Sequence, residues 1–233
     1  MDRHRTPPPH PSHAVVFAGG DLVPVVDPGL VPDGALVIAA DSGLVHAQRF
    51  GVRVHLVVGD LDSAPRDAVA AAEGDGARIE RHRPDKDQTD LELALIAAVR
   101  RGVRSIEVVG GGGGRPDHFL ANVALLCAPA FADDVALSAH LGGARLVVVR
   151  PGPPTVLAAE LGALVSLLPM HGPAVGVVTG GLRYPLDDEL LAAGSPRGMS
   201  NVVEEAPATV SLRVGVLAVV LADADPSDAP TDA

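Results

Sequence analysis

The chain has 233 residues, of which 47% are hydrophobic; this is enough to bury a core and argues against a disordered protein. The net charge of −11 disfavours a nucleic-acid partner, because binding to a phosphate backbone needs a basic surface. No apolar run approaches the roughly 20 residues that are needed to cross a membrane. We therefore expect a protein with no nucleic-acid partner and no membrane span.

The two ends differ in composition from the rest of the chain. Residues 1–12 are basic and Pro-rich, and we expect a disordered extension there rather than a signal peptide, since no long apolar segment follows. Residues 223–233 are predicted to be a disordered acidic tail. Cys127 is the only cysteine and stands in an apolar stretch, where we expect a small buried hydrophobe. A single cysteine cannot form an internal disulfide, which favours a reducing, cytoplasmic location.

Short aliphatic runs alternate with helical segments up to about residue 150. Several runs lack polar alternation, which is typical of a sheet buried on both faces. The alternation predicts an α/β domain over residues 13–150, with a doubly wound, mostly parallel sheet. The predicted strands are His13–Ala18, Ala35–Ala39, His55–Val58, Ala77–Glu80, Ser105–Val109, Val135–Ala139 and Leu146–Val149, and the predicted helices are Leu44–Phe50, Ala64–Glu73, Leu91–Arg100 and Phe119–Leu126.

The pattern changes after residue 150. Residues 151–154 read Pro-Gly-Pro-Pro and resemble a linker, and the strands that follow are short and interrupted by Gly and Pro. We expect a small all-β domain, a sandwich or partial barrel, over residues 155–222. Its predicted strands include Leu164–Leu168, Ala208–Leu212 and Val214–Leu221.

An acidic loop follows the third predicted strand. Asp60 and Asp62 are two residues apart, so in extended backbone their side chains face the same way and can share a hard cation such as Mg²⁺. The alternative is that Asp62 and Ser63 only cap the helix expected from Ala64. Capping does not account for Asp60.

A second acidic segment precedes the clearest predicted helix. Thr89 and Glu92 form a capping box, and Asp90 in the first helical turn is favoured by the helix dipole. Helix formation thus explains these residues as well as function does. It does not explain Asp87 or Lys86, the only lysine, whose compact charge suits a phosphate oxygen.

Five consecutive glycines at 110–114 join the fifth predicted strand to the next helix. Glycines such as Gly112 and Gly113 allow backbone amides to approach a phosphate, and the helix N-terminus adds a favourable field. Arg115 can contact a phosphate through two hydrogen bonds, and Asp117 adjoins it. A flexible turn has the same composition, and this is not a Walker A loop because no Gly-Lys-Ser/Thr follows.

Asp41 and Ser42, after the second predicted strand, either contact a ligand or cap the next helix. Polar loops thus follow four predicted parallel strands, whose carboxyl ends meet at one edge of a sheet. Acidic ligands, a glycine loop and a few cations together favour phosphoryl or pyrophosphoryl transfer.

Several segments resemble the thiamine pyrophosphokinase family in order and spacing. The resemblance implies an enzyme that transfers the pyrophosphoryl group of ATP to the hydroxyl of thiamine, giving thiamine diphosphate and AMP. It also implies a homodimer in which the β domain of one subunit completes the site of the other. The segments are ADSGLVHA at 40–47, VVGDLDS at 57–63, DKDQTDLELAL at 85–95 and GGGGGRPDHFLANVALL at 110–126, with VSLLPM at 165–170, GLRYPL at 181–186 and GMSNVV at 198–203 in the region similar to the thiamine-binding domain.

The resemblance also implies roles for individual residues. Tyr184 stands where the family commonly has Trp, so stacking on the thiazolium ring is kept while the cation–π attraction is weaker. Asp87 and Asp90 are candidates for a general base, if one is needed. The implied Mg²⁺ ligands are Asp60, Asp62 and Asp87; the implied nucleotide or phosphate contacts are Asp41, Thr89, Asp90, Arg115 and Asp117; and the implied pyrimidine contacts are Ser200 and Asn201.

Two alternatives stay open. Relatives of this fold also act on hydroxymethyl pterins, so the catalytic domain alone does not define the acceptor. A sensor that binds thiamine without catalysis is the other alternative, although such a protein has little use for Mg²⁺ ligands. The motifs of the β domain favour thiamine.

Overall fold

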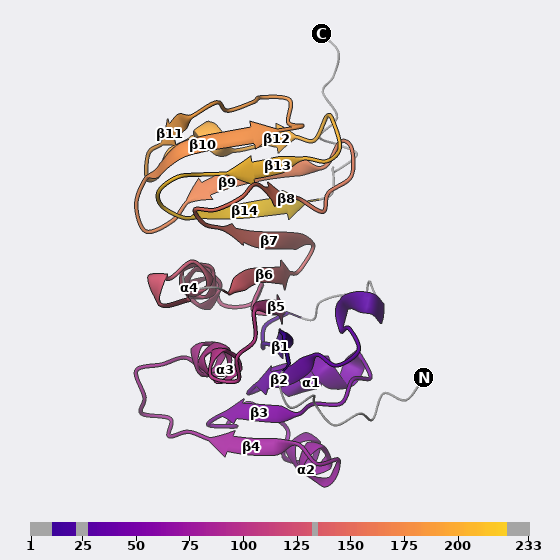
Figure 1. Cartoon of the computed structure of the whole chain (residues 1–233). Coiled ribbons are helices and arrows are strands. Elements are labelled where there is room, and N and C mark those ends of the chain that lie inside the picture. The colour runs from indigo at the N-terminus through magenta and orange to yellow at the C-terminus, as the bar shows by residue number, and fades with distance from the viewer. Residues whose placement is uncertain (1–10, 22–27, 132–134, 223–233) are drawn as a thin grey trace. The chain divides into compact units, whose positions relative to one another are not determined.

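The computed structural model describes residues 11–21, 28–131 and 135–222. The predicted tail at 223–233, and all but the last two residues of the predicted N-terminal extension, lie outside these ranges. The chain divides into two compact units (Figure 1). We call residues 1–125 and 133–142 the α/β unit, and residues 126–132 and 143–233 the β unit.

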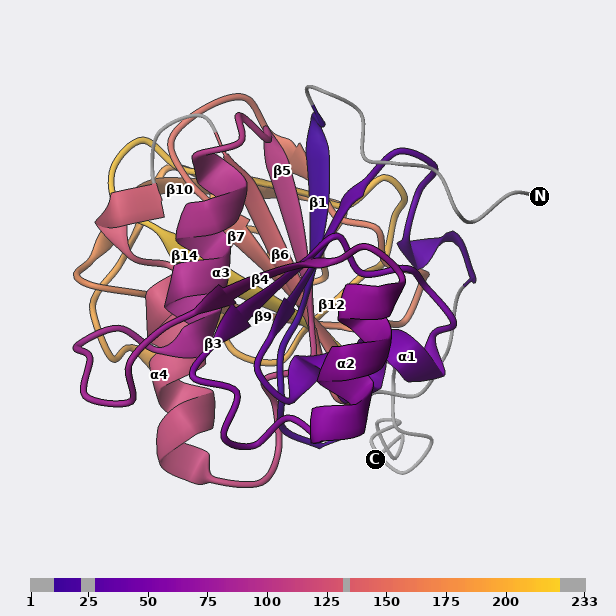
Figure 2. The same cartoon turned by 90° about the horizontal axis from the view of Figure 1, so that it is seen from below.

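The α/β unit contains a parallel sheet in the order β6-β5-β1-β2-β3-β4. Helices α1 and α2 lie on one face of this sheet, and α3 and α4 lie on the other (Figure 2). The prediction of a doubly wound parallel sheet is therefore confirmed. The strands are β1 (His13–Phe17), β2 (Leu36–Ala40), β3 (Leu56–Gly59), β4 (Arg78–Arg81), β5 (Ser105–Val109) and β6 (Ala136–Leu141), and the helices are η1 (Pro28–Leu30), α1 (Gly43–Arg49), α2 (Arg66–Gly74), α3 (Asp90–Val99) and α4 (Pro116–Leu126).

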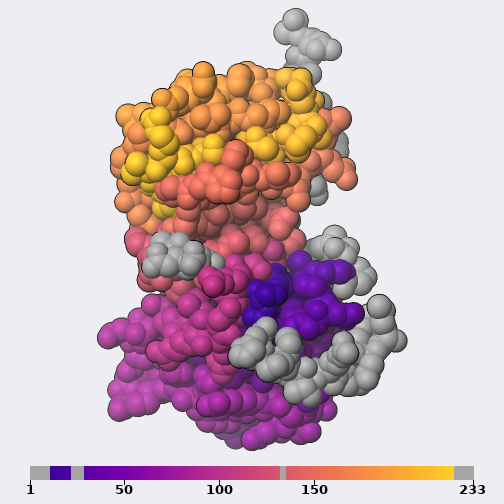
Figure 3. All heavy atoms as spheres, in the orientation of Figure 1, coloured from indigo at the N-terminus to yellow at the C-terminus, as the bar shows by residue number. Residues whose placement is uncertain are grey.

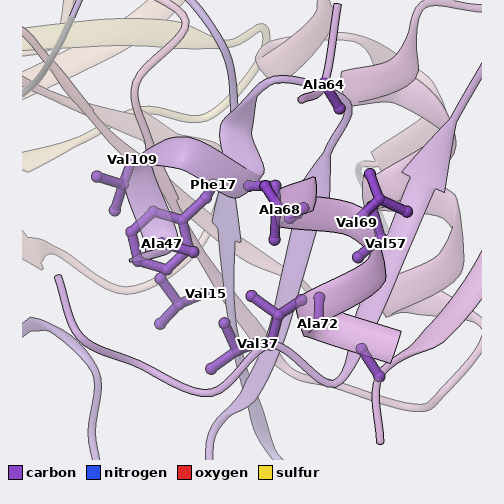
Figure 4. Packing of buried hydrophobic residues seen from close by; sticks show 14 of the residues in the cluster. Val15, Phe17, Val37, Ala47, Val57, Ala64, Ala68, Val69, Ala72 and Val109 are labelled. Atoms are coloured by element: carbon purple, nitrogen blue, oxygen red, sulfur yellow. The ribbon is translucent and has the colours of Figure 1, made fainter. Parts of the chain in front are cut away.

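Aliphatic side chains make up most of the core of the α/β unit. Val15 and Val37 point from neighbouring strands toward α1 and α2, where Ala47 and Ala68 are buried against them (Figure 4). Small alanines let the two helices approach the sheet closely. Phe17 adds one of the few aromatic rings, in an edge contact with Phe50.

Two helices begin at a different residue from the one predicted, and proline is the reason in both cases. Helix α2 begins at Arg66 instead of Ala64, because Pro65 occupies the N-cap position in an extended conformation. Helix α4 begins at Pro116 instead of Phe119, since proline suits the first turn, where its missing N–H has no partner to lose. No helix of the described ranges is long and apolar enough to span a membrane.

The β unit is a sandwich of two antiparallel sheets, as predicted. The sheets have the orders β12-β9-β14-β7 and β11-β10-β13-β8, and one hydrophobic cluster takes side chains from both, among them Leu167 and Val177. On the face shown in Figure 3 its side chains close over one another without a visible gap. The elements are η2 (Pro129–Phe131), β7 (Ala144–Val149), β8 (Thr155–Val156), β9 (Leu164–Pro169), β10 (Ala174–Gly180), β11 (Glu189–Leu191), η3 (Pro196–Gly198), β12 (Asn201–Val202), β13 (Thr209–Ser211) and β14 (Leu217–Ala222).

Two boundaries in this region differ from the sequence expectation. Strand β14 begins at Leu217 and not at Val214, because Gly215 has a φ of +102° that breaks the extended backbone. The compact units divide between Gly142 and Gly143, whereas the expected boundary was residue 150. Strand β7 pairs along its whole length with β14 and so contributes to the β unit.

Candidate active site

Three carboxylates come together at the carboxyl edge of the parallel sheet. Asp41 follows β2, and Asp60 and Asp62 follow the neighbouring strand β3. One oxygen from each of the three lies within 4.8 Å of the others. We call these three residues the carboxylate cluster. Asp41 is buried and Asp62 is exposed, so the cluster opens toward solvent on one side.

The backbone that holds the cluster is unusual at several positions. Asp41 and Leu61 have φ angles of +46° and +62°, which non-glycine residues adopt seldom. The Asp41 amide donates to the Val58 carbonyl at 2.9 Å, which fixes it beside β3. At Gly59, with a φ of +146°, an added Cβ would lie 3.0 Å from Oδ1 of Asp90 and 3.3 Å from Cβ of Asp41. A glycine at this position therefore lets the end of β3 approach both Asp41 and Asp90.

Lys86 is a cation that contacts one of these carboxylates. Its Nζ lies 2.9 Å from Oδ2 of Asp60 and 3.1 Å from Oδ1 of Asp90. The hydrogen bond from Lys86 holds the pKa of Asp60 below its usual value. Burial acts to lower the pKa of Lys86, but its hydrogen bonds to Asp60 and Asp90 outweigh burial and raise it. Lys86 therefore remains charged and balances part of the negative charge.

Asp41 has features that fit a metal ligand. Burial raises its pKa above the ordinary value, and the negative charges of Asp90, Asp60 and Asp62 add to the shift, while the Ser42 amide opposes it. Its Oδ1 is buried and has no hydrogen-bond partner among the described residues. A buried oxygen without a donor, beside two further carboxylates, matches the oxygen ligands that Mg²⁺ prefers. The residues present thus fit a hard divalent cation.

The set of grouped carboxylates differs in one member from the predicted ligands. Asp60 and Asp62 lie together as expected, but Asp87 is exposed and does not belong to the group. Asp41, expected as a nucleotide contact, takes that place. Asp62 and Ser63 do not cap α2; instead the Ser63 hydroxyl donates to Oδ1 of Asp62 at 2.9 Å.

Two of the predicted nucleotide contacts lie at helix starts. The Thr89 hydroxyl accepts the Glu92 amide at 3.2 Å, so the predicted N-cap of α3 is confirmed. Ser42 stands at the N-cap position of α1, but its side chain makes no capping hydrogen bond. Its hydroxyl instead lies against Gly19, so closely that a Cβ on that glycine would collide with it.

Two glycine-containing loops are joined beyond the ends of β1 and β5. The Gly111 amide donates to the Gly19 carbonyl at 2.6 Å, and the Asp21 amide donates to the Gly112 carbonyl at 2.9 Å. We call residues 19–21 and 110–112 the paired glycine loops. At Gly20 an added Cβ would lie 2.5 Å from the Gly112 carbonyl oxygen, so this close approach requires glycine.

The segment after the paired glycine loops offers hydrogen-bond donors. Within the described part of the chain, the amides of Gly112, Gly113 and Gly114 have no acceptor. Arg115 follows them, and its Nε donates to Oδ1 of Asp117 at 3.2 Å. This pair is exposed, and exposed ion pairs are weak enough to be exchanged for another anion.

In the β unit, Asn201 holds the backbone beside Tyr184. Its Oδ1 accepts the amides of Tyr184 and Val202 at 3.0 and 2.9 Å, and its Nδ2 donates to the Tyr184 carbonyl at 2.8 Å. Asn201 is buried, whereas the side chain of Tyr184 and residue Ser200 are exposed. Asn201 thus positions the Tyr184 backbone, a role that no sequence pattern indicated.

Two family models match the chain. The catalytic domain of thiamin pyrophosphokinase matches residues 30–137, and the vitamin B1 binding domain of thiamin pyrophosphokinase matches residues 155–217. The two matches follow each other along the chain and together cover most of it. This chain belongs to the thiamine pyrophosphokinase family.

Individual members of the thiamine pyrophosphokinase family agree with this assignment. Thiamine pyrophosphokinase from Bacillus subtilis is 27% identical over 207 residues, which cover 88% of this chain and 96% of that protein. Its crystal structure superposes with a TM-score of 0.79 and 26% identity, over 91% of this chain and 99% of the other. Thiamin pyrophosphokinase from Candida albicans shares the fold, with a TM-score of 0.75 at 14% identity, over 94% and 95% of the two chains.

Proposed function

We propose that this chain transfers the pyrophosphoryl group of ATP to the hydroxyl of thiamine, forming thiamine diphosphate and AMP. The hydroxyl oxygen attacks the β-phosphorus, the bond between that phosphorus and the oxygen bridging to the α-phosphorus breaks, and the hydroxyl proton is lost. The carboxylate cluster is the observation that carries this proposal, because an unpaired buried oxygen of Asp41 beside Asp60 and Asp62 calls for a cation at a phosphate site. The choice of thiamine as the acceptor rests on membership of the thiamine pyrophosphokinase family.

Mg²⁺ is the cation that we assign to the cluster, held by Asp41, Asp60 and Asp62. Bound there, it supplies positive charge that stabilises the negative charge of the transferring phosphates. Asp87 is exposed and lies outside the carboxylate cluster, so its role as a ligand of this cation stays a prediction. Asp90, beside Lys86, is the acidic residue that we retain as a candidate to accept the hydroxyl proton.

The remaining phosphate contacts come from the chain's own donors. Lys86 is close enough to the cluster to donate to a phosphate oxygen that approaches it. Among the described residues, the amides of residues 112–114 are free donors just before α4, where the helix dipole also favours an anion. Arg115 contacts a phosphate by exchanging Asp117 for it.

Thiamine binding belongs to the β unit in this proposal. The exposed ring of Tyr184 stacks on the cationic thiazolium ring. Hydrogen bonds with Asn201 hold the backbone of Tyr184 in place. Ser200 is exposed and is available for the pyrimidine, whereas Asn201 is buried and acts here by holding the Tyr184 backbone. We also propose a cytoplasmic homodimer, which light scattering after size-exclusion chromatography tests.

The metal assignment is tested by Asp62→Asn, which keeps the shape of the side chain but removes its charge. We expect turnover to fall at least ~100-fold, because loss of a ligand charge weakens the cation that stabilises the transferred group. Asp75→Asn, at the exposed end of α2, is the matched control and retains full activity. Near-normal turnover in Asp62→Asn would contradict the assignment.

The acceptor is tested by incubating the protein with ATP, Mg²⁺ and either thiamine or a hydroxymethyl pterin, followed by measurement of AMP. We expect AMP with thiamine only. AMP with the pterin only would overturn the choice of acceptor. Thiamine binding by calorimetry without any AMP would indicate a sensor.

A further inference from the structure

His46 is a buried histidine that the proposed chemistry does not use. It lies on α1, is only 4% exposed, and is the one buried histidine among the described residues. Its Nδ1 is buried and has no hydrogen-bond partner in the described part of the chain.

The His46 ring lies against both paired glycine loops. A Cβ on Gly110 would lie 2.9 Å from Nδ1 of His46, so the ring packs directly on the Gly110 backbone. On the other loop, the ring forms a hydrogen bond with the Gly20 backbone. One side chain therefore contacts the first glycine of the β5 loop and the central glycine of the β1 loop.

The chemical state of the ring follows from its surroundings. Burial lowers the pKa of His46, and Arg49 adds to this, while the hydrogen bond to the Gly20 backbone opposes it. No carboxylate contributes to the shift, so the ring is neutral at neutral pH. A neutral imidazole carries one N–H donor and one acceptor nitrogen. One nitrogen can therefore hydrogen-bond the Gly20 backbone while Nδ1 faces Gly110.

A purely structural role accounts poorly for this residue. A leucine fills similar space without burying a nitrogen that lacks a partner, and such a nitrogen costs stability. What distinguishes histidine here is its hydrogen bond to the Gly20 backbone and the close packing of its ring on Gly110, where a side chain larger than hydrogen does not fit.

We infer that His46 is a positioning residue, which holds Gly20 and Gly110 at the spacing that lets the amides of residues 112–114 bind the phosphates of ATP. This inference rests on the proposed function. His46 acts through the loops and not through direct contact with the reacting atoms. Replacing it therefore weakens ATP binding and leaves thiamine binding unchanged.

The test compares three variants of His46 with a control histidine. His46→Leu removes both nitrogens; His46→Asn places an amide near the position of Nδ1, and His46→Gln places one near Nε2. The control is His55→Leu, at the other end of the sheet, where Nδ1 accepts the Val37 amide at 2.9 Å. Each protein is assayed for KM toward ATP and toward thiamine, for ATP affinity by calorimetry without thiamine, and for melting temperature.

We expect His46→Leu to raise the KM for ATP and weaken ATP affinity about tenfold, with the KM for thiamine changed less than twofold. At least one amide variant recovers ATP affinity to within about threefold of the wild type. His55→Leu has a lower melting temperature than the wild type and an unchanged affinity for ATP.

Two results would overturn the inference: equal ATP affinity in wild type and His46→Leu, or an equal rise in both KM values. If His46→Leu does not fold, the inference is overturned when neither amide variant keeps ATP affinity within about threefold of the wild type. A wild type that binds ATP but releases no AMP with thiamine contradicts the proposed function alone, because the comparison of ATP affinities still holds.

Discussion

Replacing Lys86 by methionine removes the cation that contacts Asp60 and Asp90 and leaves a side chain of similar length. Lys86 makes two contacts, at 2.9 and 3.1 Å, and its side chain is 13% exposed. Hydrogen bonds to charged groups contribute about 1.5–3 kcal/mol each when shielded, and screening by the nearby solvent reduces this. We therefore expect Lys86→Met to destabilise the metal-free protein by about 2–3 kcal/mol, which corresponds to a melting temperature lower by about 5–10 °C.

The same substitution strengthens the binding of cations by the carboxylates around Lys86. In Lys86→Met the charges of Asp41, Asp60, Asp62 and Asp90 have no opposing ammonium, so Mg²⁺ without nucleotide stabilises the variant more than the wild type. Scanning calorimetry with and without Mg²⁺ measures both effects, and Lys86→Arg serves as the charge-preserving control. Equal melting temperatures of variant and wild type without metal, or a larger Mg²⁺ effect in the wild type, would refute this reasoning.

Three further predictions concern single residues. Gly59→Ala lowers turnover at least ~10-fold, because its Cβ pushes against Asp90 and the backbone strain costs about 1–3 kcal/mol, whereas Gly74→Ala, which has open space, is neutral in the same assay. Cys127, whose pKa burial raises to about 11, has only ~0.1% thiolate at pH 8, so an alkylating reagent labels it quickly only after unfolding; rapid labelling of the native protein would argue against its burial. Tyr184→Ala raises the KM for thiamine about tenfold and Tyr184→Trp lowers it, and identical values in both would exclude stacking.

Hydrophobic patterning was sufficient to predict the parallel sheet and the β sandwich. Strands that lack polar alternation must be buried on both faces, and this alone predicts the helices on either side. The starts of helices and strands were predicted less well where one residue decides the local backbone conformation. Because of Pro65 and Gly215, α2 and β14 begin later in the chain than predicted, and because of Pro116, α4 begins earlier.

The site was predictable only in part. Asp60 and Asp62 share a loop, so their spacing was enough to bring them together. Asp41 joins them through pairing of β2 with β3, and its left-handed backbone has no clear sequence signal. His46 and Asn201 act through contacts with residues far along the chain, which a single sequence does not show.

The fate of the two terminal phosphates of ATP tests the central proposal most directly. ATP labelled with ³³P at the β position and ³²P at the γ position is incubated with thiamine and Mg²⁺, and the products are separated by chromatography. The proposed reaction gives thiamine diphosphate that carries both labels in equal amounts, together with unlabelled AMP. Thiamine monophosphate that carries ³²P alone, with ³³P retained in ADP, would contradict it.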